Sequence, residues 1–92
     1  MSDLAYFEYA LVLPEERYLI EVQTRNPETG ETRGNEELER VAKEALITVI
    51  GQGRDDLEKK VRPNPISEPD AQNLKKVQQL SSGSGCAVFL VE

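Results

Sequence analysis

Few side chains in this sequence could carry chemistry, because its 92 residues include no histidine and a single cysteine, Cys86. Histidine is the usual general base near neutral pH and a common metal ligand, so its absence removes histidine-based catalysis and histidine metal sites. A reactive thiol needs a nearby cation or base, whereas free cysteines are more often buried as small apolar residues. We therefore expect Cys86 to be part of the core.

Adjacent carboxylates occur at three places, Glu15–Glu16, Glu36–Glu37 and Asp55–Asp56. Acid–base catalysis and Mg²⁺ binding need acids that converge from separate elements, at least one of them in a dry pocket. Neighbouring acids in loops and in first helical turns are usually solvated or stabilise the helix dipole. The sequence therefore predicts no catalytic residue, no metal site and no cofactor, and we expect a protein that is not an enzyme.

The serine- and glycine-rich stretch Ser81–Gly85 has the composition of a phosphate-binding loop. Such loops lead from a strand into a helix whose N-terminus faces the phosphate. Here we expect a helix before the stretch and a strand after it, so we interpret the stretch as a plain connection. The basic side chains are interleaved with acids and lack aromatic partners, a pattern that does not favour nucleic-acid binding.

The charge balance favours a protein as the partner. The chain carries 17 acidic and 11 basic side chains, a net charge of −6, and residues 1–34 hold seven of the acids against three bases. A field of this sign repels nucleic acid and anionic membranes, and it favours a basic partner or serves solubility. The single cysteine, the lack of a signal-peptide pattern and the lack of a long apolar stretch predict a cytoplasmic protein with no membrane contact.

Two strands are expected near the N-terminus. In Leu4–Leu13 one alternate set of residues is wholly apolar, and in Arg17–Arg25 apolar and polar residues alternate, apart from Leu19. The short connection between them predicts an antiparallel hairpin. Because the outer set of the second strand is charged, we expect that strand at the edge of the sheet. Pro27 and Gly30 predict a tight turn that closes a short projecting ribbon.

The clearest helical pattern covers Asn35–Ile50. Its apolar residues are spaced three and one apart in turn and form one continuous stripe, Asn35 suits the N-cap position, and Gly51 suits the C-terminal stop. A further helix is expected over residues 67–81, because Ser67 can cap it and a proline follows in the first turn. Residues 52–62 could add two or three helical turns before the prolines that follow them.

The last element expected is a strand over Cys86–Val91. It is apolar on both faces, which is typical of a strand inside a sheet, and the simplest arrangement places it beside the first strand. Together the elements predict a single α+β domain over residues 1–92 in the order ββααβ. A hairpin with its ribbon occupies 1–34, a helical segment 35–81, and a core strand 86–92. The predicted sheet has three strands, with or without the ribbon, is mostly antiparallel and carries two or three helices.

Such a sheet leaves apolar side chains on the face that points away from the main helix. By alternation these are Leu4, Tyr6, Val12 and Leu19. An apolar patch of that size on a small protein marks an interaction site unless residues 52–62 cover it. We therefore expect these four residues to bind a partner, which is another protein or a second copy of the chain.

The preferred interpretation is a small acidic, non-catalytic interaction module: a subunit, adaptor or inhibitor that binds through an apolar sheet face or edge. The alternative is a small ligand-binding domain, or a histidine-free enzyme that uses carboxylates or lysines in a pocket between sheet and helices. A minor alternative is an inhibitor whose acidic surface imitates DNA. A partner footprint on the four apolar residues would favour the interaction module. A concave pocket with converging polar groups would favour the ligand-binding domain or enzyme.

Overall fold

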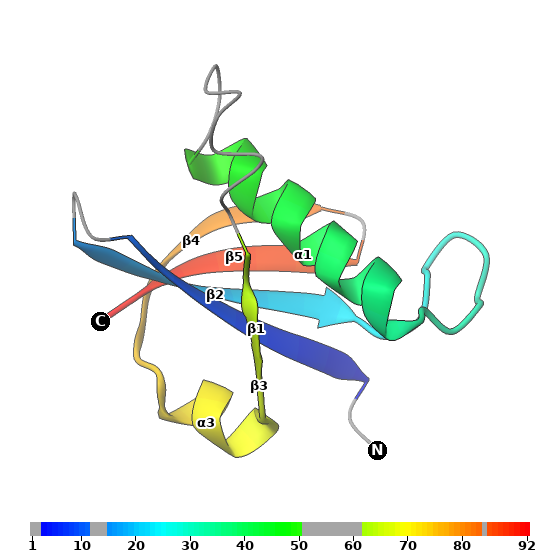
Figure 1. Ribbon diagram of the computed structural model, residues 1–92, viewed down its shortest axis with the longest axis horizontal. Helices are drawn as coiled ribbons and strands as arrows, with labels where there is room; N and C mark the ends of the chain where they lie inside the picture. Colours follow the sequence, from blue (N-terminus) through cyan, green and yellow to red (C-terminus); the bar gives the residue numbers. More distant parts are fainter. Residues whose placement is uncertain (1–2, 12–14, 51–61, 84) are drawn as a thin grey trace.

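The computed structural model describes residues 3–11, 15–50, 62–83 and 85–92. They form one five-stranded antiparallel sheet in the order β3-β1-β2-β5-β4, with helices on its two faces (Figure 1). The strands are β1 (Leu4–Leu11), β2 (Glu16–Gln23), β3 (Asn64–Ile66), β4 (Lys76–Gly83) and β5 (Cys86–Val91). The helices are α1 (Asn35–Ile50) and α3 (Glu68–Asn73).

The predicted fold class is wrong in its strands and its helices. The sheet has five strands rather than three, and the described residues hold one long helix and one short helix rather than a continuous helical segment. The order of elements is ββαβαββ instead of ββααβ. The α+β character and the antiparallel pairing are as expected. The further helical turns predicted over residues 52–62 and the helix stop predicted at Gly51 fall on residues 51–61, which, unlike Arg62, lie outside the described residues.

The N-terminal hairpin is confirmed. β1 and β2 pair antiparallel over their full length, from Leu4 opposite Gln23 to Leu11 opposite Glu16. The ribbon that follows is also present: Arg25 pairs with Thr32, and Gly30 adopts the positive φ of 75° that its turn requires.

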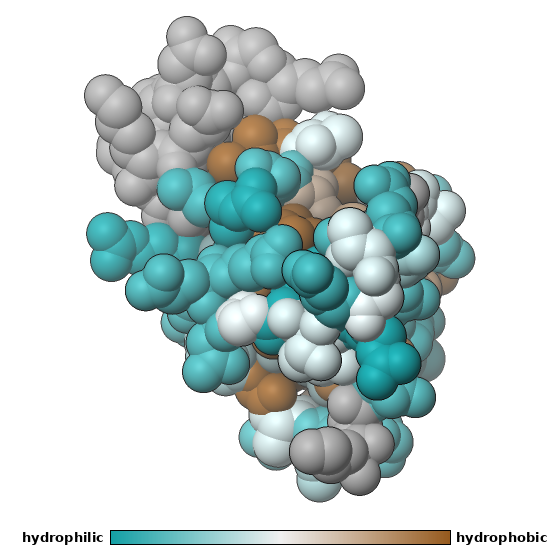
Figure 2. All heavy atoms as spheres, turned by 90° about the vertical axis from the view of Figure 1, so that its right-hand side faces the viewer, coloured by the Kyte–Doolittle hydropathy of each residue, from teal (hydrophilic) through white to brown (hydrophobic). Residues whose placement is uncertain are grey.

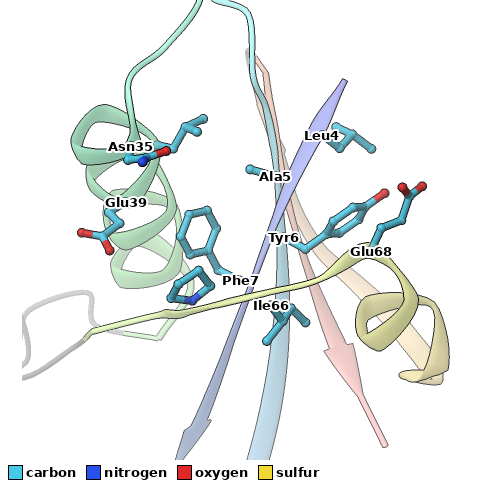
Figure 3. Close-up of a pocket in the computed structure, with 10 residues that line it drawn as sticks. Leu4, Ala5, Tyr6, Phe7, Asn35, Glu39, Ile66 and Glu68 are labelled. Carbon is cyan, nitrogen blue, oxygen red and sulfur yellow. The ribbon is translucent and has the colours of Figure 1, made fainter. Parts of the chain in front are cut away.

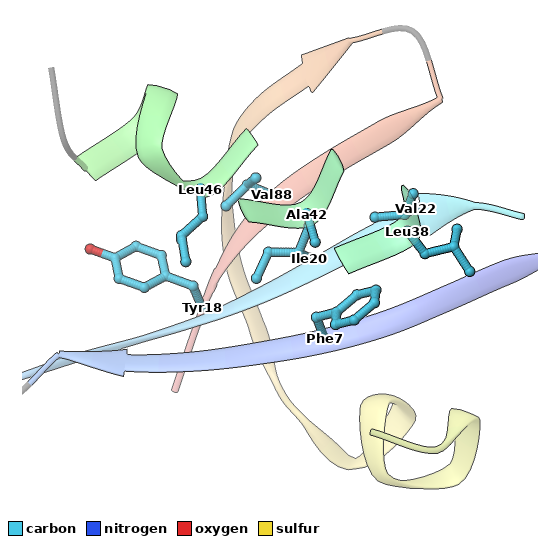
Figure 4. Close-up of a cluster of buried hydrophobic side chains, with 8 residues drawn as sticks. All are labelled: Phe7, Tyr18, Ile20, Val22, Leu38, Ala42, Leu46 and Val88. Atoms are coloured by element: carbon cyan, nitrogen blue, oxygen red, sulfur yellow. The ribbon is translucent and has the colours of Figure 1, made fainter. Parts of the chain in front are cut away.

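Helix α1 has the predicted bounds and forms the main core with one face of the sheet. Its buried side chains Leu38, Ala42 and Leu46 lie over the inner face of the sheet (Figure 4). The residues of the sheet that they contact follow the strand alternation and come from β1, β2 and β5: Phe7, Tyr18, Ile20, Val22 and Val88. This apolar layer explains why α1 forms, since an amphipathic helix gains most of its stability from packing its apolar stripe.

The place predicted for β2 is wrong. β2 lies in the centre of the sheet between β1 and β5, and β5 is not paired with β1. The charged outer residues of β2 favour an edge position, but other strands of the sheet supply partners for them. Arg17 lies 3.3 Å from Glu8 of β1, and Glu21 lies 3.1 Å from Lys76 of β4. The interior position predicted for β5 is confirmed, because β2 and β4 flank it.

The helix predicted over residues 67–81 is wrong beyond its first two turns. Ser67 caps α3 as expected, with its hydroxyl accepting a hydrogen bond from the Asp70 backbone N–H at 3.4 Å. The helix ends at Asn73, because Leu74 adopts an extended conformation. From Lys76 the chain forms β4, which pairs antiparallel with β5. Backbone pairing along β5 therefore replaces the helical turns that the sequence pattern favours.

The second face of the sheet is covered in part by α3. A small cluster joins Leu19 of β2 and Val91 of β5 to Ala71 of α3, and Tyr6 and Phe89 pack against it. Leu19 is 1% exposed. The chain therefore shields this end of the second face with its own short helix.

Candidate functional site

An open groove of about 370 Å³ lies at the outer edge of β1, between the first turns of α1 and α3. Figure 3 shows its side chains converging from β1, α1, β3 and the start of α3. The floor is formed by β1, which contributes Leu4, Ala5, Tyr6 and Phe7. The walls are Asn35, Leu38, Glu39, Pro65, Ile66 and Glu68. Its volume falls within the range of sites that hold small ligands or partner side chains.

The groove exists because β3 is short. β3 pairs with β1 only from Tyr6 to Glu8, so it does not extend along the first residues of β1. Pro65 has no N–H to donate, and Ser67 turns the chain into α3 immediately after the strand. The turn at Ser67 thus ends β3 at Ile66, opposite Tyr6, and leaves a gap between the two helices.

Two aromatic rings stand on opposite sides of the groove floor. Phe7 points toward α1 and is 3% exposed, whereas Tyr6 points toward α3 and is half-buried (Figure 3). Successive residues of a strand point to opposite faces, so this pair reaches both layers from adjacent positions. An occupant of the groove would meet the ring of Tyr6 on the α3 side and the half-buried Ala5 on the α1 side, because the ring of Phe7 is buried in the core.

Among the described residues that line the groove, the charged groups are acidic. Glu39 of α1 and Glu68 of α3 line it, and both are exposed. No lysine or arginine is among the described residues that line it. Arg40, the nearest base along α1, forms ion pairs with Glu37 at 3.7 Å and with Glu44 at 3.5 Å. An apolar floor under two carboxylates suits an apolar group that carries a nearby positive charge.

The structure brings together two of the four residues predicted to bind a partner. Leu4 and Tyr6 line the groove. Leu19 lies under α3 in the small cluster described above, and Val12 lies outside the described residues. Sequence reasoning missed the contributions of Leu38, Pro65 and Ile66. The one available signal was the pair of prolines at 63 and 65, which indicated an extended segment but not the strand that it pairs with.

A second hollow, of about 400 Å³, lies on the other side of α3, and Tyr6 and Leu19 belong to its lining. The Glu21–Lys76 ion pair occupies part of this lining, and the Lys76 ammonium also lies 4.3 Å from the centre of the Phe89 ring. These charges already have partners within the chain. The hollow therefore offers an incoming ligand less than the groove does.

The groups with perturbed acidity lie away from the groove. Burial raises the pKa of Tyr18, and its hydrogen bond to Glu16 raises this pKa further. Burial likewise raises the pKa of the Cys86 thiol, against a smaller opposite effect of the Arg33 guanidinium. A raised pKa keeps the thiol protonated and makes it a weaker nucleophile.

Within the described ranges, no three acidic or cysteine side chains come together as a possible metal site. None of the helices in the described part of the chain is both long enough and apolar enough to cross a bilayer. The face of the molecule around the start of α1 and the ribbon is mostly hydrophilic, and hydrophobic atoms show there only in small areas (Figure 2).

Comparison of the chain with models of protein families, with curated proteins and with solved structures finds no match.

Proposed function

We propose that this protein is a small, non-catalytic interaction module that binds another protein through the groove at the edge of β1. The observation that carries this proposal is the groove itself, which is lined by apolar side chains from β1, α1 and β3 and rimmed by carboxylates. A partner side chain could be buried there without displacing any of the residues that form the core. The acidic composition and the single cysteine support a cytoplasmic location for this role.

The two edges of the sheet are less suited to binding a partner strand. β4 departs from regular pairing at two places, between Lys76 and Gln78 and between Gln79 and Ser81. Bulges and lysines are devices that protect an edge strand from pairing with other chains. β3 is only three residues long and contains Pro65. These features favour side-chain docking in the groove over extension of the sheet.

A second copy of the chain is a poorer occupant than a different protein. Contact between the same grooves of two copies would bring the carboxylates of Glu39 and Glu68 toward their counterparts. The net charge of −6 adds a general repulsion between copies. We therefore propose that a different protein, and not a second copy of the chain, occupies the groove.

A small-molecule site is the second candidate function, and the size of the groove favours it. A volume of about 370 Å³ lies near the lower end of the range for small-molecule pockets. If the groove is a small-molecule site, a small molecule from a cell extract should stay bound to the native protein and should dissociate when the groove is blocked. Mass spectrometry of the protein before and after denaturation would detect such a molecule.

The interaction is tested by capturing partners on the wild-type protein and on two blocked variants, Leu4→Arg and Pro65→Arg. Pro65 is exposed and Leu4 is half-buried, so both arginines can enter the groove without filling the core. Val77→Arg is the matched control, because Val77 is 58% exposed on β4. We expect a protein that the wild type and the control retain and that both blocked variants lose, with unchanged circular dichroism. Equal retention by all four proteins would refute the proposal.

A further inference from the structure

Resting on the proposed function, we propose that the groove binds an extended segment of the partner in which two adjacent apolar side chains are flanked by lysine or arginine. The proposal names the chemistry of the partner at that site. It follows from the placement of the carboxylates and of the accessible apolar side chains around the edge of β1.

The charge requirement comes from the rim. Glu39 and Glu68 approach the groove from different helices, α1 and α3, and lie on the two sides of β1 (Figure 3). Among the described residues, no lysine or arginine lines the groove itself, although Glu39 also borders a neighbouring hollow lined by Arg40, Lys43 and Arg62. A cationic group on each side of the bound segment would meet one carboxylate each. Because both carboxylates are exposed, each pair is expected to strengthen binding only about two- to fivefold.

The apolar requirement comes from the floor. Leu4 and Tyr6 lie toward α3, whereas Ala5 lies toward α1 beside the buried ring of Phe7 (Figure 3). An occupant that contacts both sets must present apolar surface to the two sides of the sheet edge at once. An extended chain does this with two consecutive residues, since its side chains alternate in direction. A helix would place its apolar residues on one side only.

The inference is tested with three synthetic peptides and the full-length protein labelled with ¹⁵N. The first is acetyl-Lys-Leu-Leu-Lys-amide, the second replaces both lysines by glutamate, and the third replaces both leucines by serine. Backbone amide shifts locate the binding and give its Kd. We expect the first peptide to shift amides of residues 4–7 and 35–39. We also expect it to bind at least about fivefold more tightly than the glutamate peptide, because two charge contacts are reversed.

The protein variants separate a local charge effect from a general one. The double variant Glu39→Gln/Glu68→Gln should weaken the first peptide about four- to twenty-fivefold, the product of two contacts of two- to fivefold each. The matched control is Glu31→Gln/Glu44→Gln, which removes the same charge from the ribbon and from the far side of α1. It should leave the Kd nearly unchanged.

The possible results have distinct meanings. If the glutamate peptide binds as tightly as the lysine peptide, the charge requirement is wrong, while a groove that binds apolar segments remains. If the serine peptide binds equally well, the apolar requirement is wrong. If no peptide shifts the amides of the groove, the inference fails as a whole, and the capture experiment with Leu4→Arg and Pro65→Arg still decides independently whether the groove binds a protein.

Discussion

Replacement of Leu19 by alanine tests whether the chain itself covers the second face of its sheet. Leu19 is 1% exposed and lies against Ala71 of α3 and Val91 of β5. If α3 holds this position in solution, the leucine side chain is as enclosed as one in the main core. Its truncation should then be costly even when no partner is present.

The magnitude follows from the burial. Truncation of a buried leucine to alanine loses the transfer free energy of the removed carbons and leaves a cavity, together about 3 kcal/mol. A chain of this length has a total stability of roughly 5–14 kcal/mol, from about 0.05–0.15 kcal/mol per residue. The variant should therefore still fold. With an m-value of about 1.5–2 kcal/mol/M in urea, its midpoint should fall by about 1.5–2 M.

The assay is urea unfolding followed by far-ultraviolet circular dichroism at micromolar protein concentration. Val77→Ala is the control, because the side chain of Val77 is 58% exposed and its truncation should change stability by less than about 0.5 kcal/mol. If Leu19→Ala lowers the midpoint no more than Val77→Ala does, α3 does not enclose Leu19. The second face would then be open, and a partner would be needed to cover it.

Three further predictions concern single contacts. Gly85 has a φ of +84°, and a Cβ there would lie 3.1 Å from the ring of a ribbon proline, so Gly85→Ala should cost about 2 kcal/mol by urea unfolding. Gly34→Ala, which meets open space, should cost less than about 0.5 kcal/mol, and equal losses would contradict the assigned turn. Lys76→Met removes the ion pair with Glu21, whose side chain is 15% exposed. It should cost about 1 kcal/mol in the same assay, and an unchanged stability would show that the pair contributes nothing. Because the pKa of Tyr18 is raised above 10.0, its contribution to stability is complete below pH 10 and decreases as the pH rises beyond it. In unfolding experiments from pH 9 upward, the free energy of unfolding of Tyr18→Phe should therefore fall less steeply with pH than that of the wild type. Equal slopes for the two proteins would contradict this prediction.

The fold was predictable from the sequence where a pattern was regular. Helix α1 has a full apolar stripe and a favourable N-terminus, and its observed bounds are the expected ones. The first hairpin alternates over enough residues to fix its pairing, and Gly30 marks the ribbon turn. These elements needed no information from the rest of the chain.

β4 was misread as a helix for a specific physical reason. Its two pairing irregularities fall at Val77 and at Leu80, the two large apolar residues of the strand. An irregularity of this kind breaks the alternation by which a strand is recognised. Leu74, Val77 and Leu80 are instead spaced three apart, which is typical of a helix. Pairing with β5 overrides that local pattern, and no local signal reports it.

The candidate site was predictable only in part. Leu4 and Tyr6 were found because alternation along β1 shows which residues face away from α1. The opposite wall of the groove comes from residues about sixty positions later, and its place depends on the pairing of β3 with β1. Leu19 lies on the same face of the sheet as Tyr6, but α3 covers Leu19. Which residues of that face stay accessible is thus decided by the tertiary arrangement.

The most direct test of the proposed function is hydrogen exchange of the native protein, measured alone and in complex with the protein that it captures. Binding in the groove predicts slower exchange in residues 4–7, 35–39 and 64–68, with little change along β4. Protection confined to β4, or to α1 around Glu44, would contradict the account and place the interaction elsewhere.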